Sequence, residues 1–294
     1  MIKSIEEYLE QIKTEMQGSD AATIQDALAD AEEHLRAALL NLKQDQPEGS
    51  EAEALIQVIE QYGTPEETAS AYREVERRTS PALKQPARPT SFFGRFFGVY
   101  ADPRTWGSLL FMFIALVTGI IYFTWAVTGL SLSIILSIFI FGLPLAILFL
   151  LSVQGLALLE GRLVEALLGI RMPRRPVFAQ RGLKWLERLK ALVADKRTWL
   201  SLLYLILQMP LGVLYFSLFT TLFVFEVGVI IIPIVQWVFG FPTYQVAGVG
   251  FYLPVWSLLL IQLGGILLLT LTMHLARGIG WLHGRYAKWM LVTE

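Results

Sequence analysis

The residue types that carry out catalysis or bind metals are scarce in this sequence. It has no cysteine and three histidines, which excludes disulfides, thiolate catalysis and zinc–thiolate or iron–sulfur sites. His274 and His283 lie nine residues apart, so a single helix would place them on opposite faces, which makes a poor metal pair. The apolar part of the chain has no paired carboxylates, no Gly-rich phosphate loop followed by Lys and no Ser–His–Asp set. We therefore predict that the protein is not an enzyme and has no catalytic residue, metal site or cofactor.

Four polar residues within long apolar runs are candidates for ligand binding. They are Gln154, Gln208, Gln262 and Glu226. Polar groups at membrane depth are costly unless they have a partner, so each is a candidate functional group. The alternative is that they only form hydrogen bonds between neighbouring helices. Glu226 is the only charged residue between Thr198 and Ala276, and it could receive a cation or a cationic peptide, or simply cap a helix at the interface.

An acidic helix face near the N-terminus is a candidate for partner binding. Residues 1–80 carry 18 acidic and 7 basic residues, a net charge of −11, which argues against nucleic acid as a direct partner. The acidic residues opposite the apolar stripe of the second predicted helix are Asp26, Asp30, Glu32 and Glu33. This face is either solvated or a docking surface for a basic partner. Residues 160–197 carry ten Lys and Arg, so we also predict that the acidic region rests on this segment when no partner is bound.

The apolar part of the chain is organised around a motif that occurs twice, 93 residues apart. Its key residues are Asp102, Arg104 and Trp106 in the first copy and Asp195, Arg197 and Trp199 in the second. An Asp suits a helix N-cap, an Arg can extend to lipid headgroups, and a Trp favours the membrane interface. Gly119 and Gly212 share the same offset, so we interpret the pattern as an internal duplication and the motif as a structural point of membrane entry.

The apolar runs after the two motifs are each long enough for a helical hairpin. The chain is 54% hydrophobic, and residues 105–159 contain no Asp, Glu, Lys or Arg. A membrane-spanning helix needs about 20 apolar residues. We predict spans at about 107–128, 132–158, 199–225 and 253–275, with a turn at 129–131 and a re-entrant or interfacial excursion over 226–252.

The basic residues predict the orientation. All 24 Lys and Arg lie before the first apolar run, between the two runs or after the second. By the positive-inside rule, the protein is a multi-pass plasma (inner) membrane protein with cytoplasmic N- and C-termini. Membrane lipids are then partners, and a homo-oligomer is compatible with the sequence.

The first 79 residues predict a small helical domain. Ser4 with Glu7 and Ser50 with Glu53 form capping boxes, and Gly63 suits a helix end. The second helix has an apolar stripe made of Ile24, Leu28, Ala31, Leu35, Leu39 and Leu42. The predicted fold is therefore all-α: a cytoplasmic four-helix domain (1–79), a Pro-rich linker (80–91) and a polytopic membrane domain (92–294). The membrane domain comprises two tandem repeated helical hairpins, with four transmembrane helices (repeats at about 92–175 and 183–294).

Four short segments of the N-terminal domain form a recognisable pattern: Tyr8–Leu9, Glu32–Leu35, Tyr62–Glu67 and Ala71–Tyr72. In this pattern the domain resembles the HAAS family, helical signalling domains associated with helix-turn-helix regulators. The predicted membrane domain resembles the four-helix bacterial membrane sensor domain, whose entry motif is similar to residues 102–106. The long segment 226–252 departs from the first repeat, which puts any shared ligand geometry in doubt.

These resemblances imply a bacterial membrane sensor whose cytoplasmic domain engages a PadR-like winged-helix transcription regulator, without binding nucleic acid itself. Two alternatives are a small transporter or channel unit and a scaffold that binds anionic lipid through residues 160–197.

Overall fold

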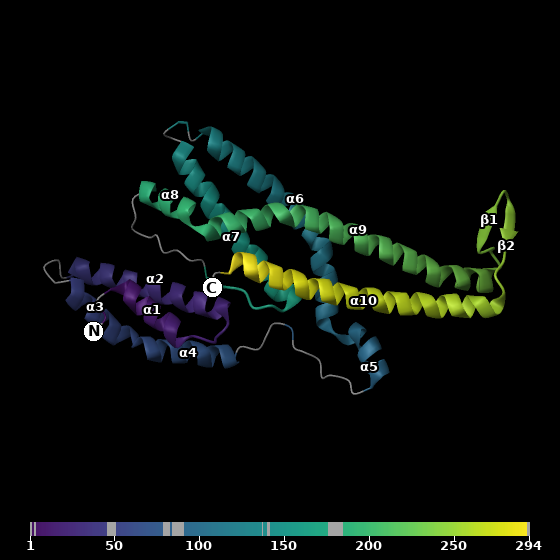
Figure 1. Ribbon diagram of the computed structural model, residues 1–294, viewed down its shortest axis with the longest axis horizontal. Helices are drawn as coiled ribbons and strands as arrows, with labels where there is room; N and C mark the ends of the chain where they lie inside the picture. The colour runs from purple at the N-terminus through teal and green to yellow at the C-terminus, as the bar shows by residue number, and fades with distance from the viewer. Residues whose placement is uncertain are drawn as a thin grey trace. The chain divides into compact units, whose positions relative to one another are not determined.

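The computed structural model shows an almost entirely helical chain (Figure 1). It describes residues 2, 4–45, 51–78, 83, 91–136, 138–139, 142–175 and 185–292. The helices are α1 (Ile5–Glu15), α2 (Ala21–Asp45), α3 (Glu51–Tyr62), α4 (Pro65–Arg78), α5 (Phe92–Phe97), the 3-10 helix η1 (Gly98–Ala101), α6 (Pro103–Leu136), α7 (Gly142–Leu168), α8 (Trp185–Ala194), α9 (Lys196–Phe239) and α10 (Val255–Leu291). The predicted linker at 80–91 lies outside the described residues, apart from 83 and 91.

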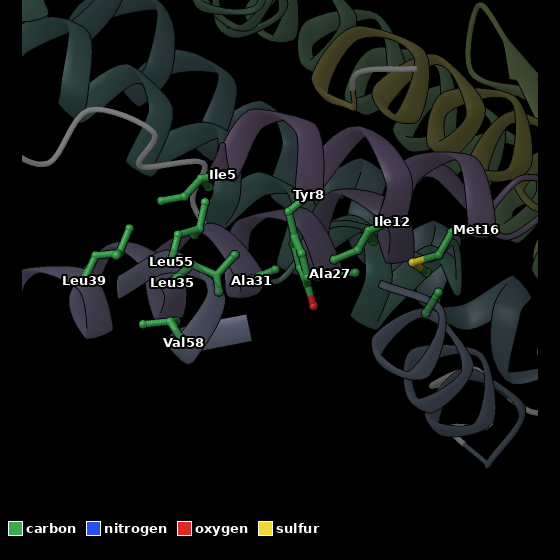
Figure 2. Packing of buried hydrophobic residues seen from close by; sticks show 11 residues of the cluster. Ile5, Tyr8, Ile12, Met16, Ala27, Ala31, Leu35, Leu39, Leu55 and Val58 are labelled. Carbon is green, nitrogen blue, oxygen red and sulfur yellow. The ribbon is translucent and has the colours of Figure 1, made fainter. Parts of the chain in front are cut away.

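Helices α1 to α4 form a small bundle around an apolar core. Figure 2 shows Leu35 and Leu55 gathered beside Ile5, with Tyr8 further along α1. The helix ends follow local signals: Ser4 Oγ accepts the amide of Glu7 at 3.1 Å. The Tyr8 hydroxyl group donates to the carbonyl oxygen of Gly63 at 2.8 Å, which ties α1 to the start of α4. The stripe predicted from the sequence therefore faces the core.

Four helices, α6, α7, α9 and α10, are long and apolar enough to cross a membrane. Many of their apolar side chains are exposed, for example Leu148, Val224 and Leu259, as expected for helices that face lipid. Helix α9 has 44 residues, which corresponds to a length of about 66 Å. The hydrocarbon core is only about 30 Å thick, so this helix must tilt strongly or project beyond the core. The fold is an all-α membrane domain with a helical N-terminal domain.

Two predicted boundaries in the apolar runs are wrong. Helix α6 continues through the predicted turn at 129–131 to Leu136, and α9 continues through Glu226 to Phe239. Lipid offers no water to the backbone, so a glycine or proline there does not end a helix as readily as it does in solution. Beyond α9, the strands β1 (Tyr244–Val246) and β2 (Val249–Phe251) form an antiparallel hairpin, visible at the end of the α9–α10 pair in Figure 1.

The contacts divide the chain into two compact units. The first contains residues 1–83, 122–206 and 284–294, and the second contains residues 84–121 and 207–283. The first unit therefore includes the helical domain, α7, α8 and the ends of three other membrane helices.

Candidate functional site

The first half of α2 is buried on two sides. One side carries the core residues Ala27 and Ala31 of the bundle. On another side, Gln25 and Asp26 are also buried, although both are polar. Asp20 begins the helix by accepting the amide of Ala22 at 2.9 Å, which fixes the register that places these side chains. A buried carboxylate requires partners, and they come from the segment after α7.

Asp26 is held by three arginines of residues 171–175. Its Oδ1 atom accepts the backbone amides of Arg174 at 2.6 Å and Arg175 at 2.8 Å. Its Oδ2 atom pairs with the guanidinium of Arg171 at 3.1 Å, and the Asp26 side chain is only 10% exposed. Two main-chain donors and one guanidinium therefore saturate one carboxylate of α2, which fixes both the position and the direction of the segment.

A second carboxylate, from α7, holds the same arginines. Glu165 accepts from Arg171 at 3.0 Å and from Arg174 at 2.9 Å. Arg171 therefore bridges a carboxylate of α7 and a carboxylate of α2. Asp30, one turn after Asp26, pairs with Arg175 and also accepts the hydroxyl group of Tyr72. We name the set made of Asp26, Asp30, Glu165, Arg171, Arg174 and Arg175 the arginine latch.

Burial dominates the electrostatics of α2 in the latch. It raises the pKa of the Asp26 carboxyl above its ordinary value, although the Arg175 and Arg174 amides and the nearby guanidinium groups oppose the rise. Burial, with the charge of Asp30, also raises the pKa of Tyr62 to about 12. The latch thus carries a desolvation cost that offsets much of its attraction, as is usual for buried ion pairs. Its clearest contribution is to fix one geometry.

Two further contacts link α2 to the ends of other membrane helices. The guanidinium of Arg197, at the start of α9, donates to Gln25 at 2.5 Å. Lys288, near the end of α10, pairs with Asp20 at 2.5 Å. The helical domain is therefore held by the segment after α7 and by residues of α9 and α10 within the first unit.

The predicted acidic face is only partly gathered in this site. Asp26 and Asp30 are in the arginine latch, Glu32 pairs with Arg36 of its own helix at 2.9 Å, and Glu33 is exposed. The predicted contact between the acidic region and residues 160–197 is present, because Asp26 binds residues 171, 174 and 175. The role of these acidic residues toward another protein stays a prediction.

The two entry motifs make the same contacts. Asp102 accepts the amide of Arg104 at 3.0 Å, and Asp195 accepts the amide of Arg197 at 3.0 Å. The indole groups of Trp106 and Trp199 donate to the carbonyl oxygens of residues 100 and 193, at 2.9 and 2.8 Å. Each Asp therefore caps the helix that comes after it, and each Trp folds back onto the preceding segment.

The second unit also pairs the first motif with α10. Asp102 forms an ion pair with Arg277 at 3.0 Å. The glycines at the 93-residue offset pack in a reciprocal way: a Cβ atom on Gly119 would lie 2.7 Å from the carbonyl oxygen of Gln208, and one on Gly212 would lie 2.3 Å from that of Ala115. Both positions require glycine because backbone approaches backbone there.

The four predicted ligand residues are divided between the two units. Gln154 donates to Thr198 at 3.2 Å in the first unit, whereas Gln208, Glu226 and Gln262 belong to the second. Glu226 is fully buried and accepts the hydroxyl group of Thr272. Because α9 continues 13 residues past it, Glu226 does not cap a helix. Their binding of a ligand stays a prediction.

Two acids of α7 were not among the predicted site residues. Glu160 is fully buried and accepts the hydroxyl group of Tyr204 at 3.0 Å. Glu165 binds the arginines of the latch. The available signal was that Glu160 is the first charged residue after the uncharged run 105–159. Within the described ranges, no group of three or more His, Cys, Asp or Glu could hold a metal ion.

Comparison with known proteins identifies the membrane part. Residues 111–291, more than half of the chain, match the model of the family described as "Putative sensor". No curated protein and no solved structure matches the chain.

Proposed function

The chain belongs to this sensor family, and we propose that it is a bacterial membrane sensor that signals through the acidic face of α2. The resemblance of residues 1–79 to HAAS domains and the placement of all Lys and Arg support a plasma-membrane protein with both termini in the cytoplasm. The stimulus acts on the membrane helices, and the output is the binding of a basic partner. We expect that partner to be a PadR-like winged-helix regulator, and we expect the protein to act by binding rather than by catalysis.

The observation that carries this proposal is the occupied carboxylate of Asp26. The chain's own arginines hold the acidic residues that would receive a basic partner. A partner that binds this face must displace the arginine latch, so the latch and the partner compete. A stimulus that favours the released state then increases partner binding without creating a new surface.

The engaged arginines also bear on the alternatives. A lipid-binding scaffold would present Arg171, Arg174 and Arg175 to anionic headgroups, whereas here each of them contacts a carboxylate of its own chain. A transporter or channel unit remains the other alternative, and substrate-dependent flux in proteoliposomes would favour it. The reciprocal packing of Gly119 and Gly212 supports the proposal that the two hairpins arose by duplication.

The direct experiment measures the binding of purified PadR-like regulators from the host to the full-length protein in nanodiscs. We expect Arg171→Ala to strengthen binding, because it weakens the competing latch. We expect Asp30→Arg to weaken binding, because it repels a basic partner. Glu10→Arg, an equal change of charge at an exposed position of α1, is the matched control and should have little effect. Failure of every regulator to bind the Arg171→Ala protein would contradict the proposal.

A further inference from the structure

One buried carboxylate gathers side chains from all four membrane helices. Glu160, on α7, accepts the hydroxyl group of Tyr204 from α9 at 3.0 Å. The Tyr122 hydroxyl group of α6 lies close to the same carboxylate. Tyr204 in turn stacks on Tyr286 of α10, with ring centroids 5.4 Å apart. An acid at membrane depth is expensive and is by default a candidate functional residue. Any change in the packing of the four helices must therefore move the partners of Glu160.

Glu160 is also close to the arginine latch. Glu165 lies five residues after it on the same helix, a rise of about 7.5 Å. Between them, Val164 is fully buried, and a Cβ atom on Gly161 would lie 3.5 Å from the Cβ atom of the buried Met172. This end of α7 is therefore packed against the segment after it, and a rotation of α7 carries Glu165 away from Arg171 and Arg174.

From this arrangement we propose that Glu160 is a positioning residue that couples the four membrane helices to the arginine latch. The proposal rests on the proposed function, because it names the route by which the membrane part acts on α2. A ligand or a change in lipid that separates Tyr204 from Glu160 turns α7, moves Glu165 and releases Asp26. Glu160 touches no ligand in this scheme.

The second hairpin carries an equivalent arrangement. His283 of α10 bonds the Tyr215 hydroxyl group at 3.0 Å and packs against Phe111 at 4.7 Å. Tyr122, near Glu160, and Tyr215, which bonds His283, are 93 residues apart. Phe111, which packs on His283, and Tyr204, which bonds Glu160, are separated by the same 93 residues. Five residues after His283, Lys288 pairs with Asp20. Each hairpin thus has a buried polar residue, Glu160 or His283, and five residues later a charged residue, Glu165 or Lys288, whose ion pairs help to hold α2.

The test is a distance measurement on the full-length protein in nanodiscs. The chain has no cysteine, so spin labels attach only at introduced sites, for which we choose the exposed Ala37→Cys on α2 and Ala166→Cys on α7. Pulsed dipolar spectroscopy then gives the ratio of docked to released molecules. Tyr204→Phe removes the hydroxyl group that donates to Glu160 and keeps the ring. The matched control, Tyr100→Phe, removes a hydroxyl group that bonds Thr270 at 3.0 Å within the second unit.

We expect Tyr204→Phe to lower the docked-to-released ratio about tenfold, the change expected for the loss of one hydrogen bond to a charged group. Tyr100→Phe should change it less than about twofold, because Tyr100 and Thr270 belong to the second unit and the latch residues to the first. Glu160→Met, which keeps the length of the side chain but removes both acceptor oxygens, should act like Tyr204→Phe and provides the test if that variant fails to fold. If Asp26→Ala releases α2 but neither the Tyr204 variant nor the Glu160 variant does, the proposed coupling is wrong, whereas the role of the arginine latch in holding α2 is supported. If Asp26→Ala also leaves the ratio unchanged, the proposed function fails with it.

Discussion

Asp26 offers the sharpest test of the arginine latch, because two substitutions remove different parts of its interactions. Alanine removes both oxygen atoms, so the amides of Arg174 and Arg175 lose their acceptor and Arg171 loses one of its two carboxylates. Asparagine keeps one side-chain oxygen for the two amides and removes only the charge that faces Arg171. The two variants therefore separate the main-chain hydrogen bonds from the ion pair.

The expected magnitudes differ because of desolvation. Each hydrogen bond to a charged group contributes about 1.5–3 kcal/mol, and Asp26→Ala removes two amide bonds and an ion pair. The variant also no longer bears the desolvation cost of the buried carboxylate, so we expect docking to be weakened by about 3 kcal/mol. That corresponds to a fall of roughly a hundredfold in the ratio of docked to released molecules. For asparagine we expect little loss, because burial disfavours the charged form, as the raised pKa of Asp26 indicates.

The assay is the dipolar measurement between labels at positions 37 and 166. We expect a short, narrow distance distribution in the unchanged protein, a nearly unchanged one for Asp26→Asn and a long, broad one for Asp26→Ala. If the asparagine variant releases α2 as fully as the alanine variant, charge rather than main-chain hydrogen bonding holds the latch, and the reasoning is refuted.

Three other outcomes are expected from the same contacts. Gly119→Ala and Gly212→Ala place a Cβ atom within 3 Å of a facing backbone, so each should lower the free energy of unfolding in detergent by about 1–3 kcal/mol, seen as a lower midpoint in a thermal unfolding assay. A Cβ atom at Gly155 meets nothing within 4 Å, so Gly155→Ala is the control and should have no effect. Equal effects at all three positions would argue against close packing. Because the pKa of Asp26 is raised in the docked state, docking takes up protons at pH values between the ordinary and the raised pKa. The docked fraction should therefore rise as the pH falls through the raised pKa, and it should be lower above that pKa. Asp26→Asn should abolish this dependence, and a docked fraction that falls over the same pH range would speak against it. Raising the salt concentration to about 0.5 M should weaken the exposed ion pairs, such as Arg175 with Asp30, and lower the docked fraction. A distance distribution that does not change with salt would contradict this prediction.

Local signals predicted the helical domain almost to the residue. The predicted capping residue Ser4 precedes α1, and Gly63, with φ +108°, comes directly after α3. These signals work because a cap is a contact between residues three or four apart, which the sequence displays directly. The four long apolar helices were predicted for a similar reason, since length and composition alone identify them.

The ends of the apolar helices could not be predicted in the same way. Turn signals such as Gly129 derive from chains in water, where a broken helix can hydrogen-bond to solvent. In lipid the same residue stays helical, and α6 runs seven residues beyond it. For the same reason, Pro233 lies inside α9 without ending it.

The arginine latch was predicted only as an attraction between charges. The sequence shows an acidic region and a basic segment, but the strongest partners of Asp26 are main-chain amides 148 and 149 residues away. Every residue except proline has a backbone amide that can donate, so the sequence does not show which amides will bind Asp26. The roles of Glu160 and Glu165 could not be predicted, because these residues lie where an apolar run meets a basic segment and only tertiary contacts reveal their partners.

The most direct measurement is thiol crosslinking in native membranes of a chain with Asp30→Cys and Arg175→Cys, positions that form an ion pair in the structure. The chain has no other cysteine, so a short bifunctional maleimide reports on this pair alone. We expect a prominent crosslink, lost when Asp26→Ala is added. Absence of the crosslink in the chain that keeps Asp26 would contradict the claim that the membrane domain holds the acidic face of α2.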